Sequence, residues 1–213
     1  MINLQNVLYL YFGNLSPREQ QYKSGLFWGL TPHPESDRDI PHDARDPLPF
    51  SDASVKAVQS QDVFEHLEYN LVASVLDEVF RCLTPGGIFR LSLPDYNSPL
   101  LKSRSVYDAD GNVLFDAAMG GSVVGKMNGG IEVKFSPGGE AHIWFPTYST
   151  VTAMIVASQI RKSSSIEFHH AWIDSKRFVC KEFDQAIMPV RRSPPNDMRA
   201  GGKPVSIVVD FIK

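Results

Sequence analysis

Residues 55–95 read VKAVQSQDVFEHLEYNLVASVLDEVFRCLTPGGIFRLSLPD, and this stretch decides the fold class. Its first apolar residues, 55–58, predict a short strand. From residue 68 to residue 83, apolar side chains recur at helical spacing. The sequence TPGG at 84–87 ends this helix, because proline cannot continue a helix and glycine supplies the turn. Residues 88–94 predict a second strand, so the segment is a strand–helix–strand unit whose crossover makes its strands parallel.

Apolar runs outside this unit extend the same pattern. The continuous run at 7–12 is typical of a strand that is covered on both faces of a parallel sheet. The runs at 166–172 and 205–212 predict two further strands. Residues 149–162 predict a helix, although their β-branched content leaves a strand as the alternative. The fold class is therefore α/β.

The domain organisation follows from what the sequence lacks. No internal repeat and no polar linker divides the chain, so residues 1–213 are expected to form a single domain. Residues 97–148 are rich in glycine and serine and show little periodicity. This stretch is expected to be an insertion of short strands or loops, and long irregular segments in compact domains are often functional.

Composition excludes several classes of protein. The chain has 213 residues, 43% of them hydrophobic, and a net charge of -3, which argues against a general nucleic-acid binder. Two cysteines are too few for a disulfide framework or a cysteine-ligated zinc site. No apolar run reaches the roughly 18 residues of a membrane span, and the start does not resemble a secretory signal. We expect a cytoplasmic protein without membrane or nucleic-acid partners; its oligomeric state is not indicated.

Four blocks of the sequence carry a family resemblance. They are DARDPLPFSDAS at 43–54, QDVFEHL at 61–67, VFRCLTPGG at 79–87 and FRLSLPD at 89–95. In this order and spacing they resemble class I S-adenosylmethionine-dependent methyltransferases of the type-11-like branch. The resemblance implies a Rossmann-like fold with a mostly parallel sheet, an antiparallel last strand and helices on both faces. It also implies S-adenosylmethionine as the cofactor.

The chain departs from this family upstream of the four blocks. The family's first strand normally ends in an acidic residue and a Gly-x-Gly-x-Gly turn, whereas this chain keeps only Gly13 there. The second strand normally ends in an acid that binds the ribose hydroxyls. Here the residues at 30–34, which include Thr31, offer no acid, unless Glu35 or Asp37 reaches back. Because glycine permits close backbone approach and an acid can accept from two hydroxyls, we expect weaker cofactor binding than in a full-motif enzyme.

The resemblance implies a set of cofactor contacts at or just after strand ends. They are Gly13, Thr31, Asp43, Ala44, Ser60, Gln61 and Asp62. In the family pattern, the acid at the position of Asp43 accepts from the adenine amino group, and the next backbone N–H, that of Ala44, meets the ring. The alternatives are a turn role for Asp43 and a helix cap at Asp62, since aspartate favours both positions.

Two residues are candidates for acid–base chemistry. His66, in the EHL segment, can act as a general base near neutral pH, and its alternative is a structural hydrogen bond that holds the loop. Asp95 follows the strand at 88–94 and could orient or deprotonate an acceptor hydroxyl, and its alternative is a helix cap.

No metal site is expected from the sequence. The spacings among His142, His169, His170 and Asp174 match no standard metal-binding motif. Adjacent histidines on a strand also point to opposite faces.

The leading functional hypothesis is methyl transfer from S-adenosylmethionine to a small-molecule or saccharide acceptor. The alternative is a binding or scaffold protein that has lost a full cofactor site. A dinucleotide-dependent oxidoreductase is disfavoured, because the motif Gly-x-Gly-x-x-Gly is absent after Phe12.

Overall fold

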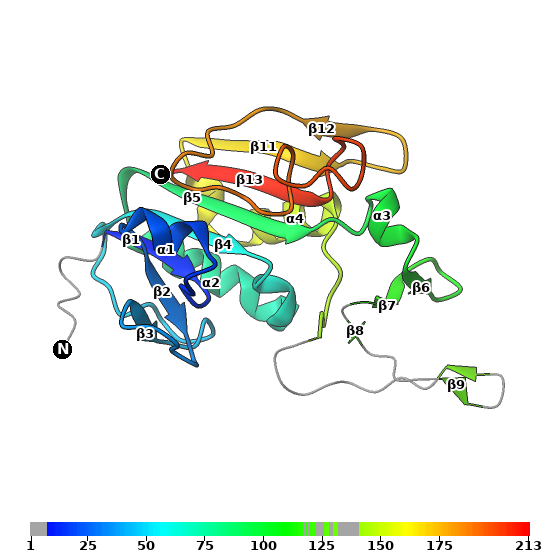
Figure 1. The fold of residues 1–213 in the computed structure, drawn as a ribbon, viewed down its shortest axis with the longest axis horizontal. Helices are drawn as coiled ribbons and strands as arrows, with labels where there is room; N and C mark the ends of the chain where they lie inside the picture. Colours follow the sequence, from blue (N-terminus) through cyan, green and yellow to red (C-terminus); the bar gives the residue numbers. More distant parts are fainter. Residues whose placement is uncertain (1–7, 117, 119, 122–125, 128–129, 132–140) are drawn as a thin grey trace.

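A computed structural model describes residues 8–213 apart from 117, 119, 122–125, 128–129 and 132–140. Its main sheet has eight strands in the order β12-β11-β13-β5-β4-β1-β2-β3 (Figure 1). Their bounds are β1 (Tyr9–Phe12), β2 (Trp28–Thr31), β3 (Asp39–Pro41), β4 (Val55–Gln61), β5 (Leu83–Pro94), β11 (Ser165–Trp172), β12 (Phe178–Cys180) and β13 (Ser206–Ile212).

Helices and short strands complete the architecture. The helices are α1 (Gln20–Ser24), α2 (Tyr69–Cys82), α3 (Pro99–Lys102) and α4 (Tyr148–Ala157), with 3-10 turns η2 (Phe64–His66) and η3 (Gln159–Lys162). The short strands are β6 (Ser105–Tyr107), β7 (Val113–Asp116), β8 (Gly120–Gly121), β9 (Lys126–Met127) and β10 (Gly130–Ile131). No helix in the described part of the chain is long and apolar enough to cross a membrane.

The sheet is mixed in the way that the sequence and the resemblance predict. Strands β3, β2, β1, β4 and β5 run parallel to one another, whereas β13 is antiparallel to both β5 and β11. The predicted helix at 149–162 is confirmed as α4 followed by η3, so the strand alternative is wrong there. The expected turn at 84–87 is instead the irregular start of β5, where Gly86 has a φ of 75°.

The prediction of a single domain with an insertion at 97–148 stays a prediction. The short strands β6–β10 all fall within that range.

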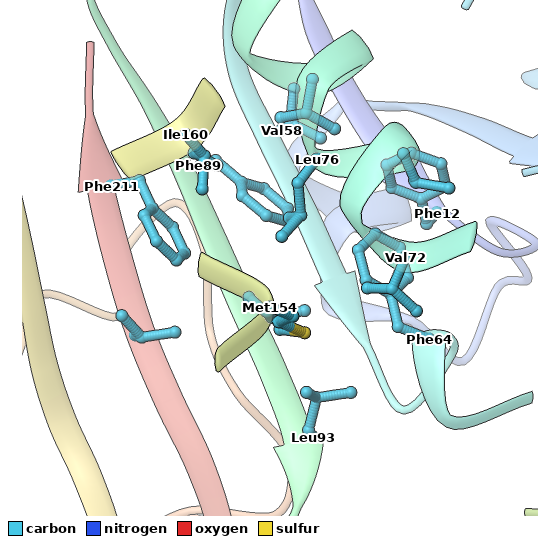
Figure 2. Close-up of a cluster of buried hydrophobic side chains, with 14 of the residues drawn as sticks. Phe12, Val58, Phe64, Val72, Leu76, Phe89, Leu93, Met154, Ile160 and Phe211 are labelled. Atoms are coloured by element: carbon cyan, nitrogen blue, oxygen red, sulfur yellow. The ribbon is translucent and has the colours of Figure 1, made fainter. Parts of the chain in front are cut away.

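One face of the sheet is covered by helices and an apolar core. Side chains from β1, β4, β5 and β13 point to this face and pack against α2, α4 and η3 (Figure 2). They include Phe12, Val58, Phe89 and Phe211, and the rings of Phe89 and Phe211 stack with centroids 5.6 Å apart. The helical spacing seen in the sequence therefore marks the face of α2 that is buried.

The opposite face is covered mainly by irregular chain. Its apolar cluster contains Tyr11 of β1, Ala57 of β4, Phe27 and Met188, with Tyr22 of the short helix α1 packed against it. Residues 181–205, all of them described, form no helix or strand. Helices thus lie on both faces, as predicted, but very unevenly.

A buried arginine fastens this irregular chain to the sheet. Arg90 of β5 donates two hydrogen bonds to the carboxylate of Asp210 on β13, from Nε at 2.7 Å and from Nη2 at 2.6 Å. Its Nη1 donates to the carbonyls of Asp184 and Met188, at 2.6 and 2.7 Å. The guanidinium also lies 4.6 Å from the ring centroid of Phe183. Burial alone would raise the pKa of Asp210, but the hydrogen bonds from Arg90 and His169 outweigh this effect and lower the pKa.

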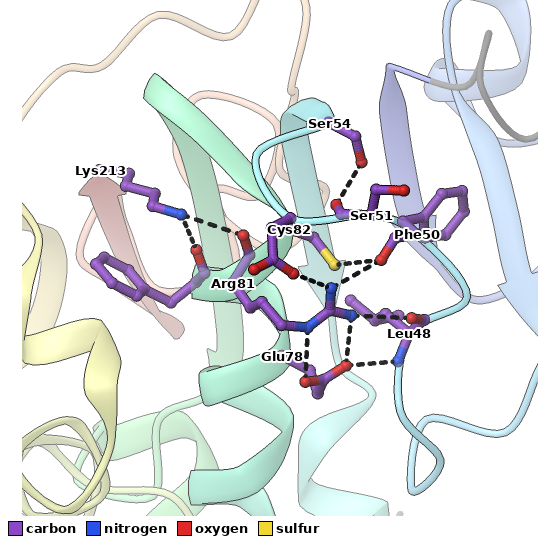
Figure 3. Close-up of polar contacts among 10 residues, drawn as sticks. Leu48, Phe50, Ser51, Ser54, Glu78, Arg81, Cys82 and Lys213 are labelled. Carbon is purple, nitrogen blue, oxygen red and sulfur yellow. Dashed lines mark hydrogen bonds and ion pairs between the residues drawn. The ribbon is translucent and has the colours of Figure 1, made fainter.

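A second arginine joins two of the sequence blocks that carry the family resemblance. Arg81, at the end of α2, donates to the carbonyls of Leu48 and Phe50 in the PLPF segment, at 3.0 and 2.8 Å (Figure 3). It also pairs with Glu78 at 2.8 Å and Asp52 at 2.7 Å. Its guanidinium therefore fixes the loop between β3 and β4 against α2.

Loss of the buried Arg90 charge should destabilise the protein strongly. Arg90→Met leaves the Asp210 carboxylate buried without its main partner, and we expect a loss of about 3–5 kcal/mol in the free energy of unfolding. Urea denaturation followed by circular dichroism measures it. The control is Arg177→Met, whose side chain is 76% exposed and pairs with Asp174; its effect should stay within about 0.5 kcal/mol. Equal effects of the two substitutions would contradict the anchoring role of Arg90.

Candidate functional site

The predicted site residues gather at one edge of the sheet. Because β1 to β5 are parallel, their carboxyl ends meet at the same edge, and ligands in open α/β sheets bind outside such ends. In the register of the sheet, Phe12 of β1 lies opposite both Leu30 of β2 and Ser60 of β4, and Gln61 lies opposite Ser92 of β5. The loops that follow these strands hold the remaining predicted residues.

The loop after β1 is held by an aspartate in place of a glycine-rich turn. Gly13 has a φ of 119°, a conformation that favours glycine, and its N–H donates to the Leu30 carbonyl at 2.8 Å. The buried Asp39 of β3 accepts the Leu15 N–H at 2.8 Å through Oδ1. A side chain at Gly29 would collide with Asp39 Oδ1 and lie 2.7 Å from the Gly13 carbonyl oxygen. Neither Asp39 nor Gly29 was a predicted site residue, and a glycine inside a strand run was the available signal.

Two of the predicted cofactor contacts are engaged within their own loops. The buried Thr31 hydroxyl accepts the His33 N–H at 3.1 Å. Asp43 accepts from Arg45 through the backbone N–H and Nε at 2.9 Å and Nη2 at 2.6 Å. These hydrogen bonds from Arg45 lower the pKa of Asp43 to about 2. The half-buried Ala44 packs against the main apolar core.

The end of β4 presents buried polar groups. Ser60 is fully buried on the helix-covered face, and Gln61 on the other face accepts the Arg191 N–H at 3.0 Å. Asp62 follows with a φ of 52° and pairs with Arg192 Nε at 3.2 Å. Burial raises the pKa of Asp62, and the charge of Arg192 partly offsets this rise.

Residues of the irregular segment 181–205 therefore reach the carboxyl ends of β1 to β5, the predicted cofactor edge. Besides the Arg192–Asp62 pair, Arg191 Nη1 lies 3.0 Å from Glu19 Oε1, just before α1. Sequence reasoning missed both pairs, because the partners are far apart in the chain and no motif links them.

Unpartnered polar atoms concentrate at this edge. Buried polar groups are ordinarily hydrogen-bonded, so unpaired ones mark places where a polar ligand can bind. Among the described residues, buried side-chain atoms without a hydrogen-bond partner at this edge include Asn14 Oδ1, His42 Nε2, Ser60 Oγ, Gln61 Nε2, Asp62 Oδ1 and Ser92 Oγ. They follow or end β1, β3, β4 and β5, and they offer both donors and acceptors.

The two predicted acid–base residues are placed differently. Asp95 is fully buried, and its carboxylate accepts the N–H groups of Asn97 at 2.9 Å and Trp172 at 2.6 Å. The side chain of His66 is 18% exposed, and its Nδ1 lies 2.9 Å from the Ala141 carbonyl oxygen. Burial lowers the pKa of His66, so its ring is neutral at pH 7. Both catalytic roles stay predictions.

Comparison with known proteins agrees with this geometry. Residues 32–91 match the family model of a methyltransferase domain, which spans β3, β4, α2 and most of β5. A solved S-adenosylmethionine-dependent methyltransferase from Archaeoglobus fulgidus is 12% identical, with a TM-score of 0.51 over 99% of this chain and 88% of that chain. One from Methanosarcina mazei is 16% identical, with a TM-score of 0.51 over 98% and 93% of the two chains. Among the curated proteins, none matches.

Residues 32–91 are thus recognised as methyltransferase-like, and the chain has the Rossmann-like fold of the solved methyltransferases. The family resemblance carried by the four sequence blocks is confirmed, and so is the Rossmann-like fold. At the carboxyl edge of the parallel strands, Asp39 holds the loop after β1, and the two arginines at 191 and 192 pair with Glu19 and Asp62.

Burial of Asp95 in the methyltransferase domain should make stability depend on pH. Burial raises the pKa of Asp95 to about 7, although the Trp172 and Asn97 N–H groups partly offset it. The folded state therefore holds this proton more tightly than the unfolded state, whose pKa is about 3.9, and the carboxyl contributes stability that is lost as pH rises from about 4 to about 7. Asp95→Asn should flatten this slope in urea denaturation at pH 5, 6 and 7, whereas the exposed Asp174→Asn should not. An unchanged slope in Asp95→Asn would count against the raised pKa.

Proposed function

We propose that this domain transfers a methyl group from S-adenosylmethionine to a small-molecule or saccharide acceptor. The observation that carries the proposal is the set of unpartnered buried polar atoms at the carboxyl ends of β1, β3, β4 and β5, in a domain of the methyltransferase family. A cytoplasmic location and the absence of nucleic-acid partners stay predictions that accompany it.

The polar atoms of this edge fit an amino-acid sulfonium cofactor. The Oδ1 atoms of Asn14 and Asp62 are free acceptors suited to an ammonium group, and the Gln61 amide, which lies beside the Tyr11 hydroxyl, is a donor suited to a carboxylate. When bound, S-adenosylmethionine supplies an electrophilic methyl group for in-line displacement by the acceptor. The protein's contribution is to align the acceptor and exclude water.

The acceptor side of the site is assigned to the turn after β4. His66 lies one turn beyond Asp62, and it is neutral and partly exposed. Asp95 has both carboxylate oxygens committed to backbone N–H groups, so its role in the proposal is to position the end of β5 against β11. The insertion at 97–148 is proposed to shape acceptor choice.

Binding of S-adenosylhomocysteine tests the cofactor half of the proposal. Calorimetric titration should show micromolar binding, with NAD as a negative control. Asp62→Asn should weaken it by roughly 1–3 kcal/mol, because a charged acceptor is lost from the buried edge. The matched control, Asp174→Asn, should bind as the wild type does, since Asp174 is exposed. Equal affinity in a folded Asp62→Asn protein would remove Asp62 from the site.

The adenine contact of Asp43 has a separate test. Asp43→Ala should weaken S-adenosylhomocysteine binding by roughly 1–3 kcal/mol. Arg45→Ala frees the same carboxylate from its internal partner and should leave the affinity unchanged or raise it. If the two substitutions weaken binding equally, the pair acts by holding the loop, and Asp43 is not an adenine ligand.

A scaffold function remains the competing hypothesis, favoured by a specific observation. Three of the predicted cofactor contacts already have internal partners: Thr31 with His33, Asp43 with Arg45, and Gln61 Oε1 with Arg191. A folded protein that binds neither S-adenosylhomocysteine nor NAD would support this function and would contradict methyl transfer.

A further inference from the structure

A buried cluster of three metal-binding side chains lies next to the cofactor edge. Glu65 and His66 come from η2, and His142 comes from the segment that precedes α4. One ligand atom from each lies within 4.8 Å of the others. In the described part of the chain, this is the only group of three or more histidine, cysteine or acidic side chains with such geometry.

Hydrogen bonds fix the orientation of both imidazole rings. His66 Nδ1 lies 2.9 Å from the Ala141 carbonyl oxygen, so Nδ1 carries the proton and Nε2 carries the lone pair. His142 Nδ1 lies 2.6 Å from the Tyr96 hydroxyl, which itself donates to Asp116 Oδ2 at 2.8 Å. The Tyr96 oxygen therefore accepts from His142 Nδ1, and the His142 lone pair is also on Nε2.

Both lone pairs face a carboxylate. Glu65 is fully buried, and its Oε1 lies 3.6 Å from His142 Nε2 and 3.9 Å from His66 Nε2. Among the described residues, no side chain donates a hydrogen bond to either Glu65 oxygen or to His142 Nε2, and only the backbone N–H of Glu65 itself approaches its carboxylate. An arrangement of acceptors alone is unfavourable in a protein interior, because buried polar groups need partners. A cation among the three groups removes this cost.

We propose that Glu65 Oε1, His66 Nε2 and His142 Nε2 bind a zinc ion. The contacts of 3.6 and 3.9 Å are too long for hydrogen bonds. They are close to the spacing of about 3.4 Å that ligands at about 2.0–2.2 Å take around a tetrahedral ion. Two histidines and one carboxylate form a known donor set for zinc with an open fourth position.

The groups behind the ligands support a metal site. Histidines that bind metals donate their other ring N–H to a carbonyl or, directly or through a relay, to a carboxylate. Here, the Ala141 carbonyl serves His66, and the Tyr96–Asp116 relay serves His142. Arg104 pairs with Asp116 at 2.8 Å and keeps that carboxylate in place. Sequence spacing gave no sign of this site, because His142 is distant in the chain from its proposed partners.

Zinc at this place would change the part that His66 plays, an inference that rests on the proposed function. As a ligand through Nε2, His66 holds the ion and does not itself take the acceptor's proton. An acceptor hydroxyl bound at the open position would release its proton to water more readily, because the charge of the ion stabilises the oxyanion. The experiments on zinc binding do not require methyl transfer, so a failure of the proposed function would leave their result unchanged.

Metal analysis of tag-free full-length protein tests the proposal. After dialysis against zinc and then gel filtration, elemental analysis should find about one zinc per chain. Chelator competition should show at least tenfold weaker zinc binding in Glu65→Gln and His142→Gln. Tyr96→Phe removes the relay without removing a ligand, and roughly tenfold to 100-fold weaker binding is expected. The controls His33→Gln, an exposed histidine, and Cys180→Ser, an exposed thiol, should keep zinc.

Cobalt substitution keeps the proposal falsifiable if the core variants fail to fold. Cobalt-loaded wild type should show the visible bands of a four-coordinate site with nitrogen and oxygen ligands. A thiolate-to-cobalt band that disappears in Cys180→Ser would overturn the proposal, as would a folded wild type that retains no zinc. Full zinc content in a folded His142→Gln protein would overturn it too. Titration with S-adenosylhomocysteine on the same samples reports the cofactor site separately.

Discussion

The Arg90 guanidinium is the constraint on which the cofactor edge depends. One face of the sheet has helices to cover it, but in the described part of the chain the other is covered mainly by α1 and irregular chain, above all residues 181–205. A segment without its own hydrogen-bond ladder must find partners elsewhere for its backbone. Arg90 provides two of them, at the carbonyls of Asp184 and Met188, while Asp210 neutralises its charge. The amides of Gln21 and Gln59 add bonds to the Pro189 carbonyl, at 3.1 and 2.9 Å.

The chemistry at the strand ends follows from that anchoring. Just past Pro189, the chain places Arg191 beside Glu19 and Arg192 beside Asp62. The edge thus holds buried carboxylates with cationic partners from a distant segment, together with unpaired amide and hydroxyl groups. In the proposed function, a cofactor with an ammonium and a carboxylate would exchange partners with these groups, and Asp62 would have to leave Arg192 in order to bind it.

Sequence reasoning succeeded where local pattern decides structure. The strand–helix–strand unit became β4, α2 and β5, because apolar spacing and the turn residues at 84–87 agree there. The helix that was expected at 149–162 is also present, and Thr147 caps its start through the Thr150 N–H. The four family blocks were also informative, since Arg81 physically joins two of them. Their order could be read from the chain, whereas their contacts could not.

Partnerships between distant residues were beyond the sequence. Nothing in the local pattern shows that Asp39 holds the loop after β1, or that Glu65 and His142 meet. Thr31 and Asp43 were recognised as strand-end residues, but their hydrogen bonds to His33 and Arg45 depend on loop conformations that composition does not fix. Such contacts follow from the tertiary structure, which brings together groups with no periodic relation.

The unequal covering of the two faces also bears on how this domain can change over evolutionary time. On the helix-covered face, substitutions are limited by side-chain volume, because closely packed rings and aliphatic groups leave few voids. On the other face, a few polar anchors hold a loop whose remaining residues are freer to vary. Exchange or lengthening of that loop could alter the charges presented at the strand ends while the apolar core is inherited unchanged. The charges that residues 181–205 bring to the strand ends and the packing of the apolar core are therefore set by largely separate parts of this chain.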